Sequence, residues 1–298
     1  MNASKNRTLR GVLCTTIGGV CWGISGTCGQ YLFSNYEISS LWLTCVRLLA
    51  GGLILTLLAL PRHRHDILAL LRDRRDTLQL VLYGICGLLL CQYSYMTAIS
   101  WSNAATITVL QNLSLVLIML YTCLRDRRRP QRRELLALIL ALVGIYLLAT
   151  GGKPSQMMLS PQGLFWGLAA ALAVAIYSLL PRSLLARWDR GVVTGLGMLI
   201  GGMVINAATR SWTISVSLPI QGWLAVGGVV LLGTALAFPL IMQGIADIGP
   251  VRSSMLATTE PVSATILSVL WLGTSFTVTD IIGFAAIISI IFLLAKSE

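Results

Sequence analysis

The chain has 298 residues, of which 56% are hydrophobic and only 11% are charged, and its formal net charge is +11. An ordinary soluble domain carries about 25% charged residues, so this composition argues against a soluble globular protein. It predicts a polytopic membrane protein, and the basic excess needs an explanation within that class.

Ten apolar stretches follow one another along the chain with short connections between them. A helix that crosses a hydrocarbon core of about 30 Å needs roughly 20 apolar residues, and each stretch is close to that length. They predict an all-α polytopic fold of ten transmembrane helices without a soluble domain. The approximate ranges are 10–33, 37–60, 78–98, 103–124, 134–151, 162–185, 191–209, 221–243, 249–272 and 279–296.

The basic residues gather on one side of this predicted bundle. With the N-terminus placed in the cytoplasm, the inside segments hold seventeen Lys and Arg residues, and the outside loops hold only Lys153 and Arg210. Cytoplasmic loops of membrane proteins carry such an excess, so we expect both termini to be cytoplasmic. The net charge then reflects anchoring at the lipid bilayer, and no nucleic-acid partner is expected.

The second half of the chain repeats the hydropathy pattern of the first. Residues 98–149 lie over residues 244–295 at a constant offset of 146, and Gly11 pairs with Gly163 at an offset of 152. Duplicated hydrophobic bundles are typical of secondary transporters. Five spans is an odd number, so the second repeat enters the membrane upside down. We therefore expect two inverted five-helix repeats, residues 1–152 and 153–298.

The sequence offers little that could support catalysis or metal binding. The seven cysteines fall inside predicted spans without a Cys-x-x-Cys pair, and His63 and His65 lie in a charged loop. Among the eleven acidic residues, only Glu260 lies well inside a span. We expect no enzyme activity, no metal and no cofactor. Without an ATP-hydrolysing motif, transport would be driven by a gradient or by a partner.

Short motifs in several spans give a resemblance that covers essentially the whole chain. They are Trp22-Gly23-Ile24-Ser25, then Arg47 with Leu48-Leu49-Ala50, then Glu260-Pro261-Val262-x-Ala264, followed by Leu270-x-Leu272-Gly273 and Gly283. In this order the chain resembles EamA-type members of the drug/metabolite transporter superfamily, as two EamA units. The resemblance implies ten helices around a central cavity and export or exchange of small metabolites such as amino acids. Thr274 departs from the family pattern, which usually has an acid there.

Polar residues inside the spans are the candidates for a cavity wall. Such residues avoid lipid and face either a neighbouring helix or water. For a single residue the two interpretations are equally good, whereas the whole set favours a cavity. Tyr and Trp suit amphipathic or aromatic solutes, because they combine an apolar body with a polar edge. The candidate substrate-binding residues are Gln92, Tyr95, Gln111, Asn112, Tyr177 and Gln243, with Trp22 and Trp166 near the wall.

Arg47 and Glu260 are the clearest charges inside the predicted membrane region. An unpaired charge at the bilayer centre costs at least roughly 2.5–3.5 kcal/mol, so each is expected to have a partner or water. Glu260 has three competing interpretations: a structural ion-pair partner, a proton-coupling site, or a site that captures a cationic group of the substrate. Arg47 is either structural or holds a substrate carboxylate.

Prolines interrupt only the second half of the apolar pattern. Pro181, Pro239 and Pro261 each remove a backbone donor, which predicts kinks concentrated in that half. Discontinuous helices often shape the binding site of a transporter.

Together these features favour a secondary active transporter of the plasma (bacterial inner) membrane. We expect it to export or exchange a small organic solute by alternating access, with proton coupling as one option, as a monomer or a homodimer. An uncoupled channel or a lipid-handling membrane protein is the alternative.

Overall fold

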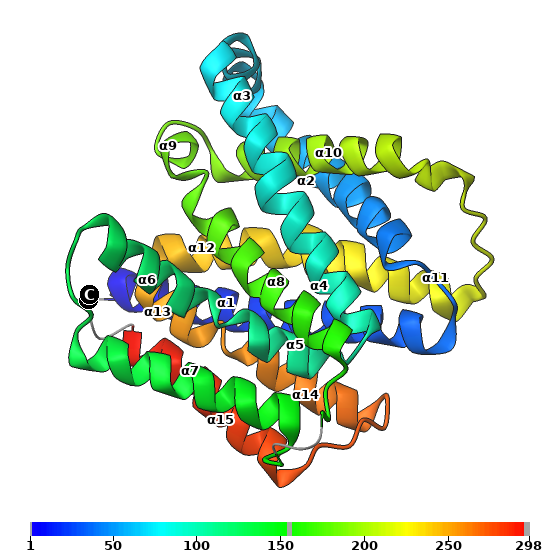
Figure 1. Cartoon of the computed structure of the whole chain (residues 1–298). Helices are drawn as coiled ribbons and strands as arrows, with labels where there is room; N and C mark the ends of the chain where they lie inside the picture. The colour runs from blue at the N-terminus through cyan, green and yellow to red at the C-terminus, as the bar shows by residue number, and fades with distance from the viewer. Residues whose placement is uncertain (1, 154–156, 295–298) are drawn as a thin grey trace.

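A computed structural model describes residues 2–153 and 157–294 (Figure 1), and these residues form helices and connections with no strand among them. The first half contains α1 (Asn2–Asn35), α2 (Ser40–Arg72), α3 (Arg74–Leu82), the π-helix η1 (Tyr83–Leu89), α4 (Leu90–Ser100), α5 (Ala104–Gln111), α6 (Ser114–Arg125) and α7 (Arg132–Thr150). The second half contains α8 (Pro161–Leu179), α9 (Arg182–Leu185), α10 (Arg190–Thr209), the 3₁₀ turn η2 (Ser211–Thr213), α11 (Ile220–Gly227), the π-helix η3 (Gly228–Leu236), α12 (Ala237–Ile248), α13 (Pro250–Leu256), α14 (Thr259–Leu270) and α15 (Val278–Leu294).

Several helical segments are long and apolar enough to cross a membrane. Within the described ranges there are eight of these, namely Asn6–Asn35, Ser40–Arg72, Arg74–Ser100, Ala104–Arg125, Arg132–Thr150, Pro161–Leu179, Arg190–Thr209 and Ile220–Ile248. The chain is therefore a multi-pass membrane protein. Of the two other expected spans, 279–296 corresponds to the shorter apolar helix α15, and 249–272 is divided between α13 and α14.

Helix starts recur at the offset that relates the two halves of the sequence. Three pairs of starts lie 146 residues apart: Arg74 with Ile220, Ala104 with Pro250, and Arg132 with Val278. The π-helical segments η1 and η3 overlap at the same offset. π-Helical turns are rare and are often found at functional sites. Their recurrence means that both halves contain irregular backbone at equivalent positions.

The expected spans 103–124 and 249–272 are interrupted at equivalent positions. α5 ends one residue before Asn112, and α13 ends two residues before Thr258, which lies 146 positions after Asn112. At the second interruption the N–H of Glu260 donates to the carbonyl of Ala257 at 2.9 Å, which satisfies a carbonyl that Pro261 leaves without its helical donor. The first interruption contains no proline. We expected kinks to be concentrated in the proline-rich half, but the first half contains an equivalent interruption.

The two halves interlock, so that the core belongs to both. α1 packs mainly on α12 and α14, while α8 packs on α4, α5 and α6. α2 lies against α10, and α7 lies against α15 along one side of the bundle (Figure 1). At the latter contact a Cβ on Gly144 would stand 3.2 Å from the carbonyl of Gly283, so only a very small residue allows the two helices this approach.

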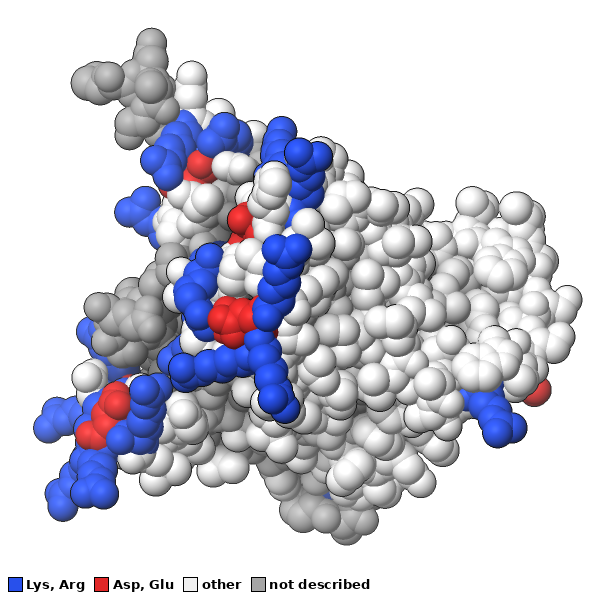
Figure 2. Space-filling model, turned by 90° about the horizontal axis from the view of Figure 1, so that it is seen from above, with Lys and Arg blue, Asp and Glu red and all other residues white. Residues whose placement is uncertain are grey.

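Lys and Arg gather at one end of the bundle, on the left in Figure 2, which we call the charged end. It comprises the first turns of α1 and the connections α2–α3, α6–α7 and α9–α10. Ion pairs hold it together: Arg10 donates twice to Asp247 at 2.8 Å, and Arg128 donates twice to Glu134 at 2.7 Å. Glu134 also raises the pKa of Arg128 through these bonds. The opposite end includes the connections α1–α2, α4–α5 and α14–α15 and carries few charged residues; for contrast it is called the uncharged end.

Candidate functional site

A central cavity of about 250 Å³ lies between the two halves. It has polar and charged lining on one part and aromatic or aliphatic lining on the rest, which is the make-up of a small-molecule site. The structure brings eight of the ten candidate residues to this cavity, namely Trp22, Arg47, Gln92, Tyr95, Gln111, Asn112, Tyr177 and Glu260.

The cavity lies where equivalent positions of the two repeats meet. At the offset of 146, several pairs contribute both members to its wall, namely Gln92 with Phe238, Thr108 with Ser254, Gln111 with Ala257, and Ser114 with Glu260. At the offset of 152, Trp22 pairs with Val174, and both also line the cavity. The pairs are chemically unequal, because the position of Glu260 in the second repeat is equivalent to the uncharged Ser114 of the first.

Arg47 lies on α2 and is almost completely buried, with 4% of its surface exposed. Its Nη2 lies 3.4 Å from the carbonyl oxygen of Gly233, a long contact. Its Nε and Nη1 have no hydrogen-bond partner within the described structure. A buried donor without a partner costs roughly 1–3 kcal/mol, and more when it is charged. This side chain therefore presents two unsatisfied donors beside the cavity.

Glu260 lies in the first turn of α14 and faces the same cavity. In the part of the chain that the structure describes, no ion pair joins it to Arg47, although the two opposite charges attract each other electrostatically. The interruption before α14 determines where this carboxylate lies, because it breaks the span two residues earlier. An acid and a base thus face one cavity without being neutralised by direct contact.

The carbonyl of Gly233 connects three elements around Arg47. It belongs to the π-helix η3 and accepts from the Nε1 of Trp22 at 3.1 Å as well as from Arg47. A Cβ at Gly233 would stand 2.7 Å from the Cβ of Ser25 and 3.1 Å from Nη2 of Arg47. Only glycine lets α1 and α2 approach η3 this closely.

Some of the polar wall is used for contacts between helices. The hydroxyl of Tyr95 on α4 bonds to the Oγ1 of Thr108 on α5 at 2.8 Å. Within α5 and its C-cap, Nδ2 of Asn112 donates to the carbonyl of Thr108 at 3.2 Å. For Gln92 and Gln111, no side-chain hydrogen bond occurs among the described residues. The amides of these two residues are therefore the neutral polar groups best placed to meet a solute.

Two candidate residues lie elsewhere. Trp166 packs edge-on against Tyr93, with ring centroids 5.4 Å apart, and does not line the central cavity. Gln243 donates to Asp247 at 3.0 Å and lines a second, more open cavity of about 770 Å³ at the charged end, which we call the vestibule. Polar side chains bound part of the vestibule, among them Arg62, His63, Asp189 and Arg190. Phe238 lines both cavities and therefore separates them.

Several wall residues were not singled out from the sequence, namely Leu88, Cys91, Val174, Phe238, Ser254, Ala257 and Ile291. The wall also contains Thr108, Ser114 and Leu115, which belong to the polar span of Gln111 and Asn112; helical spacing puts Thr108 and Leu115 on the same face as those two residues. Phe238 and Ala257 are apolar residues in apolar spans, so polarity gave no signal for them. The repeat offset could have found both, because it relates them to Gln92 and Gln111.

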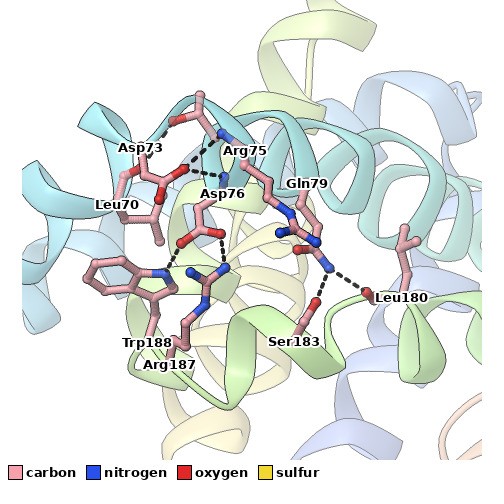
Figure 3. A network of polar contacts seen from close by, with 10 residues as sticks. Leu70, Asp73, Arg75, Asp76, Gln79, Leu180, Ser183, Arg187 and Trp188 are labelled. Atoms are coloured by element: carbon pink, nitrogen blue, oxygen red, sulfur yellow. Dashed lines mark hydrogen bonds and ion pairs between the residues drawn. The ribbon is translucent and has the colours of Figure 1, made fainter.

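A polar network at the charged end also joins the two halves (Figure 3). The carboxylate of Asp76 on α3 is fully buried and accepts hydrogen bonds from Arg187 and, at 2.8 Å, from Nε1 of Trp188. Gln79, one turn further along α3, donates to the carbonyl of Leu180 at 3.2 Å and to Ser183. These contacts fix the start of α3 against the α8–α10 connection, next to Asp189 of the vestibule.

Comparison with known proteins places this architecture in a family. The chain is 37% identical over 288 residues to the uncharacterized inner membrane transporter YicL of Salmonella typhimurium, covering 97% of this chain and 96% of that protein. It is 23% identical over 268 residues to an uncharacterized transporter of Methanothermobacter thermautotrophicus, covering 87% and 77% of the two chains. One solved crystal structure shares the fold with a TM-score of 0.61 at 19% identity, covering 100% of this chain and 99% of that one.

The model of the EamA-like transporter family matches the chain twice, over residues 9–150 and 161–296. Two matched units agree with the two sets of equivalent helix starts and with the shared wall of the cavity. The chain belongs to the EamA-like transporter family.

Proposed function

We propose that this protein is a secondary active carrier that binds a small organic solute in the central cavity and moves it by alternating access. The observation that carries the proposal is the buried guanidinium of Arg47, which has two donors without a partner beside that cavity. Such a group is costly in an empty apolar site, and a bound carboxylate would satisfy it with charge-assisted hydrogen bonds.

The other residues of the cavity wall are suited to binding an amphipathic solute. Trp22, Tyr95, Tyr177 and Phe238 supply aromatic surface, and Gln92 adds an amide. Aromatic rings with a polar edge accept both the apolar body and the polar rim of such a molecule. The solute we infer is therefore a small organic acid or zwitterion with an apolar part, in accord with export or exchange of small metabolites.

Glu260 is the residue that we propose for coupling. Its carboxylate faces the cavity without a hydrogen-bond partner in the described structure, and it feels the charge of Arg47. A carboxyl group in this position can bind a proton on one side of the membrane and release it on the other. A structural role and the capture of a cationic solute group are the competing roles, and the Glu260→Gln variant separates them.

The proposed orientation follows the distribution of charge. Arginine-rich connections are retained in the cytoplasm of bacterial cells, so the charged end is placed inside, with both termini. The two halves are then inverted repeats, and the membrane is the plasma (bacterial inner) membrane, in accord with the printed description of the relative from Salmonella.

The test is counterflow in proteoliposomes loaded with individual organic acids and zwitterions. A carrier shows exchange that saturates with solute concentration and depends on an internal counter-solute. The alternative function, an uncoupled channel or a lipid-handling protein, gives flux without counterflow. Arg47→Gln in the same vesicles is expected to raise the solute concentration for half-maximal exchange by about 10- to 100-fold. Wild-type protein without saturable exchange of any tested solute class would overturn the proposal.

A further inference from the structure

The two ends of the solute pathway differ in how they are closed. Towards the charged end, the central cavity adjoins the vestibule, and only the ring of Phe238 is shared between them. Towards the uncharged end, a buried amide joins three elements from both halves. We infer that Gln30 closes the uncharged end of the pathway and acts as the positioning residue that decides from which side the central cavity is reached. This inference rests on the proposed carrier function.

Gln30 uses its whole amide group in this contact. Its Oε1 accepts from the backbone N–H of Ala104 at 2.9 Å and from the hydroxyl of Ser268 at 3.1 Å. Its Nε2 donates to Oγ1 of Thr274 at 3.0 Å. Gln30 is 6% exposed, and Ala104 and Ser268 are fully buried. One side chain of α1 therefore ties the start of α5 to the end of α14 and the connection that follows.

The contact lies beyond the cavity on every helix that contributes to it. From the cavity residue Trp22, Gln30 is eight residues further along α1, and Ser268 is eight residues beyond Glu260 on α14. At 1.5 Å per residue this is about 12 Å towards the uncharged end. Ala104 precedes the cavity residue Thr108 by one turn, or about 6 Å. The amide thus lies between the cavity and the connections of the uncharged end.

Aromatic side chains pack on both sides of the Gln30 amide and reinforce this closed end. Tyr31 stacks on Trp271 with ring centroids 5.1 Å apart, which joins α1 to the end of α14 a second time. On the cavity side, a Cβ on Gly26 would lie 2.6 Å from the hydroxyl of Tyr95, so Tyr95 packs directly on α1 one turn below Gln30. Opening this end requires α1, α5 and α14 to separate, and the three bonds of Gln30 oppose that.

A cysteine in the wall of the central cavity can report from which side the cavity is accessible, without any solute. Cys91 lines the central cavity. In a parent protein that keeps Cys91 and lacks the six other cysteines, a membrane-impermeant thiol reagent can be applied to one face of sealed vesicles at a time. The parent is expected to react from one face only, the face of the charged end. Because the readout is labelling, it is independent of whether a transported solute has been found.

Gln30→Ala is expected to increase the rate of Cys91 modification from the opposite face by about tenfold, because it removes three hydrogen bonds that hold that end closed. Gln79→Ala is the matched control, since Gln79 also joins the two halves through its amide, but at the charged end. The control is expected to leave labelling from the uncharged end at the parental rate.

Two milder variants keep the test decisive if Gln30→Ala does not fold. Ser268→Ala and Thr274→Ala each remove one bond and leave the amide in place, so smaller increases from the same face are expected. Parental rates from the uncharged end in every folded variant would overturn the inference. An equal increase with Gln79→Ala would overturn it too, because it would indicate general loosening.

Discussion

Arg47 and Glu260 line one cavity from different halves of the chain, and no ion pair joins them within the described structure. A direct pair would have neutralised both groups and left the cavity with little charge to offer. Held apart, they leave a cationic donor and an anionic acceptor available to a solute or a proton. Most of the expected behaviour of this protein follows from that separation.

Arg47→Gln is expected to weaken binding of a carboxylate-bearing solute by about 10- to 100-fold, because hydrogen bonds to a charged group contribute roughly 1.5–3 kcal/mol. Arg47→Lys keeps the charge but loses the planar fork, so it should bind with intermediate affinity. The measurement is the solute-induced thermal shift in detergent over a concentration series. Equal affinity of the wild type and Arg47→Gln would refute a role in carboxylate binding.

Glu260→Gln preserves the shape of the side chain and removes its titration. If Glu260 couples transport to protons, this variant loses accumulation driven by a pH gradient while solute exchange at equal pH continues. Both rates are measured in the same batch of proteoliposomes. Undiminished pH-driven accumulation would exclude Glu260 as the coupling site, and loss of folded protein would favour a structural role.

Gly233→Ala is expected to destabilise the protein by about 1–3 kcal/mol, because the added methyl group overlaps Ser25 and presses on the guanidinium of Arg47. Gly227→Ala, just before η3, is the matched control, since a Cβ there meets nothing within 4 Å. Thermal unfolding of the two variants provides the comparison. A Gly233→Ala protein as stable as the control would contradict the close packing described for η3.

Asp76→Asn should lower stability by roughly 1–3 kcal/mol, because it weakens the buried hydrogen bonds from Arg187 and Trp188. Half of the Arg187 side chain is exposed, so the loss is smaller than for a fully buried ion pair. Asp66→Asn tests an exposed carboxylate that pairs with His63, where at most about 1 kcal/mol is expected. Similar unfolding temperatures for both variants would argue against the Asp76 network as a link between the halves.

The proposed topology can be tested with single cysteines on a cysteine-free background. Arg127→Cys, in the α6–α7 connection, should react with an impermeant thiol reagent only from the cytoplasmic face. Arg210→Cys, in the α10–α11 connection, should react only from the outside. Labelling of the Arg127 position from outside would reverse the orientation that the basic residues predict.

The membrane-spanning helical fold and the duplication could be predicted from the sequence because both depend on composition along the chain. Apolar stretches of membrane length have few alternatives to helices, since every backbone polar group in a bilayer needs a partner within the chain. The family followed from motifs around Trp22, Arg47 and Glu260. The interruptions were harder to predict, because the break at Asn112 contains no proline.

The sequence by itself determined that Arg47 and Glu260 would be charges inside an apolar bundle, because the hydropathy of the surrounding residues is enough to identify them. Only the tertiary structure decided that they share one cavity and that the carbonyl of Gly233 meets both Trp22 and Arg47. The tertiary structure also places Trp166 and Gln243 away from the central cavity, and it places the apolar Phe238 between the two cavities. The physical reason is that hydropathy shows which residues avoid lipid, whereas the packing of α1, α8 and their partners decides which of them meet.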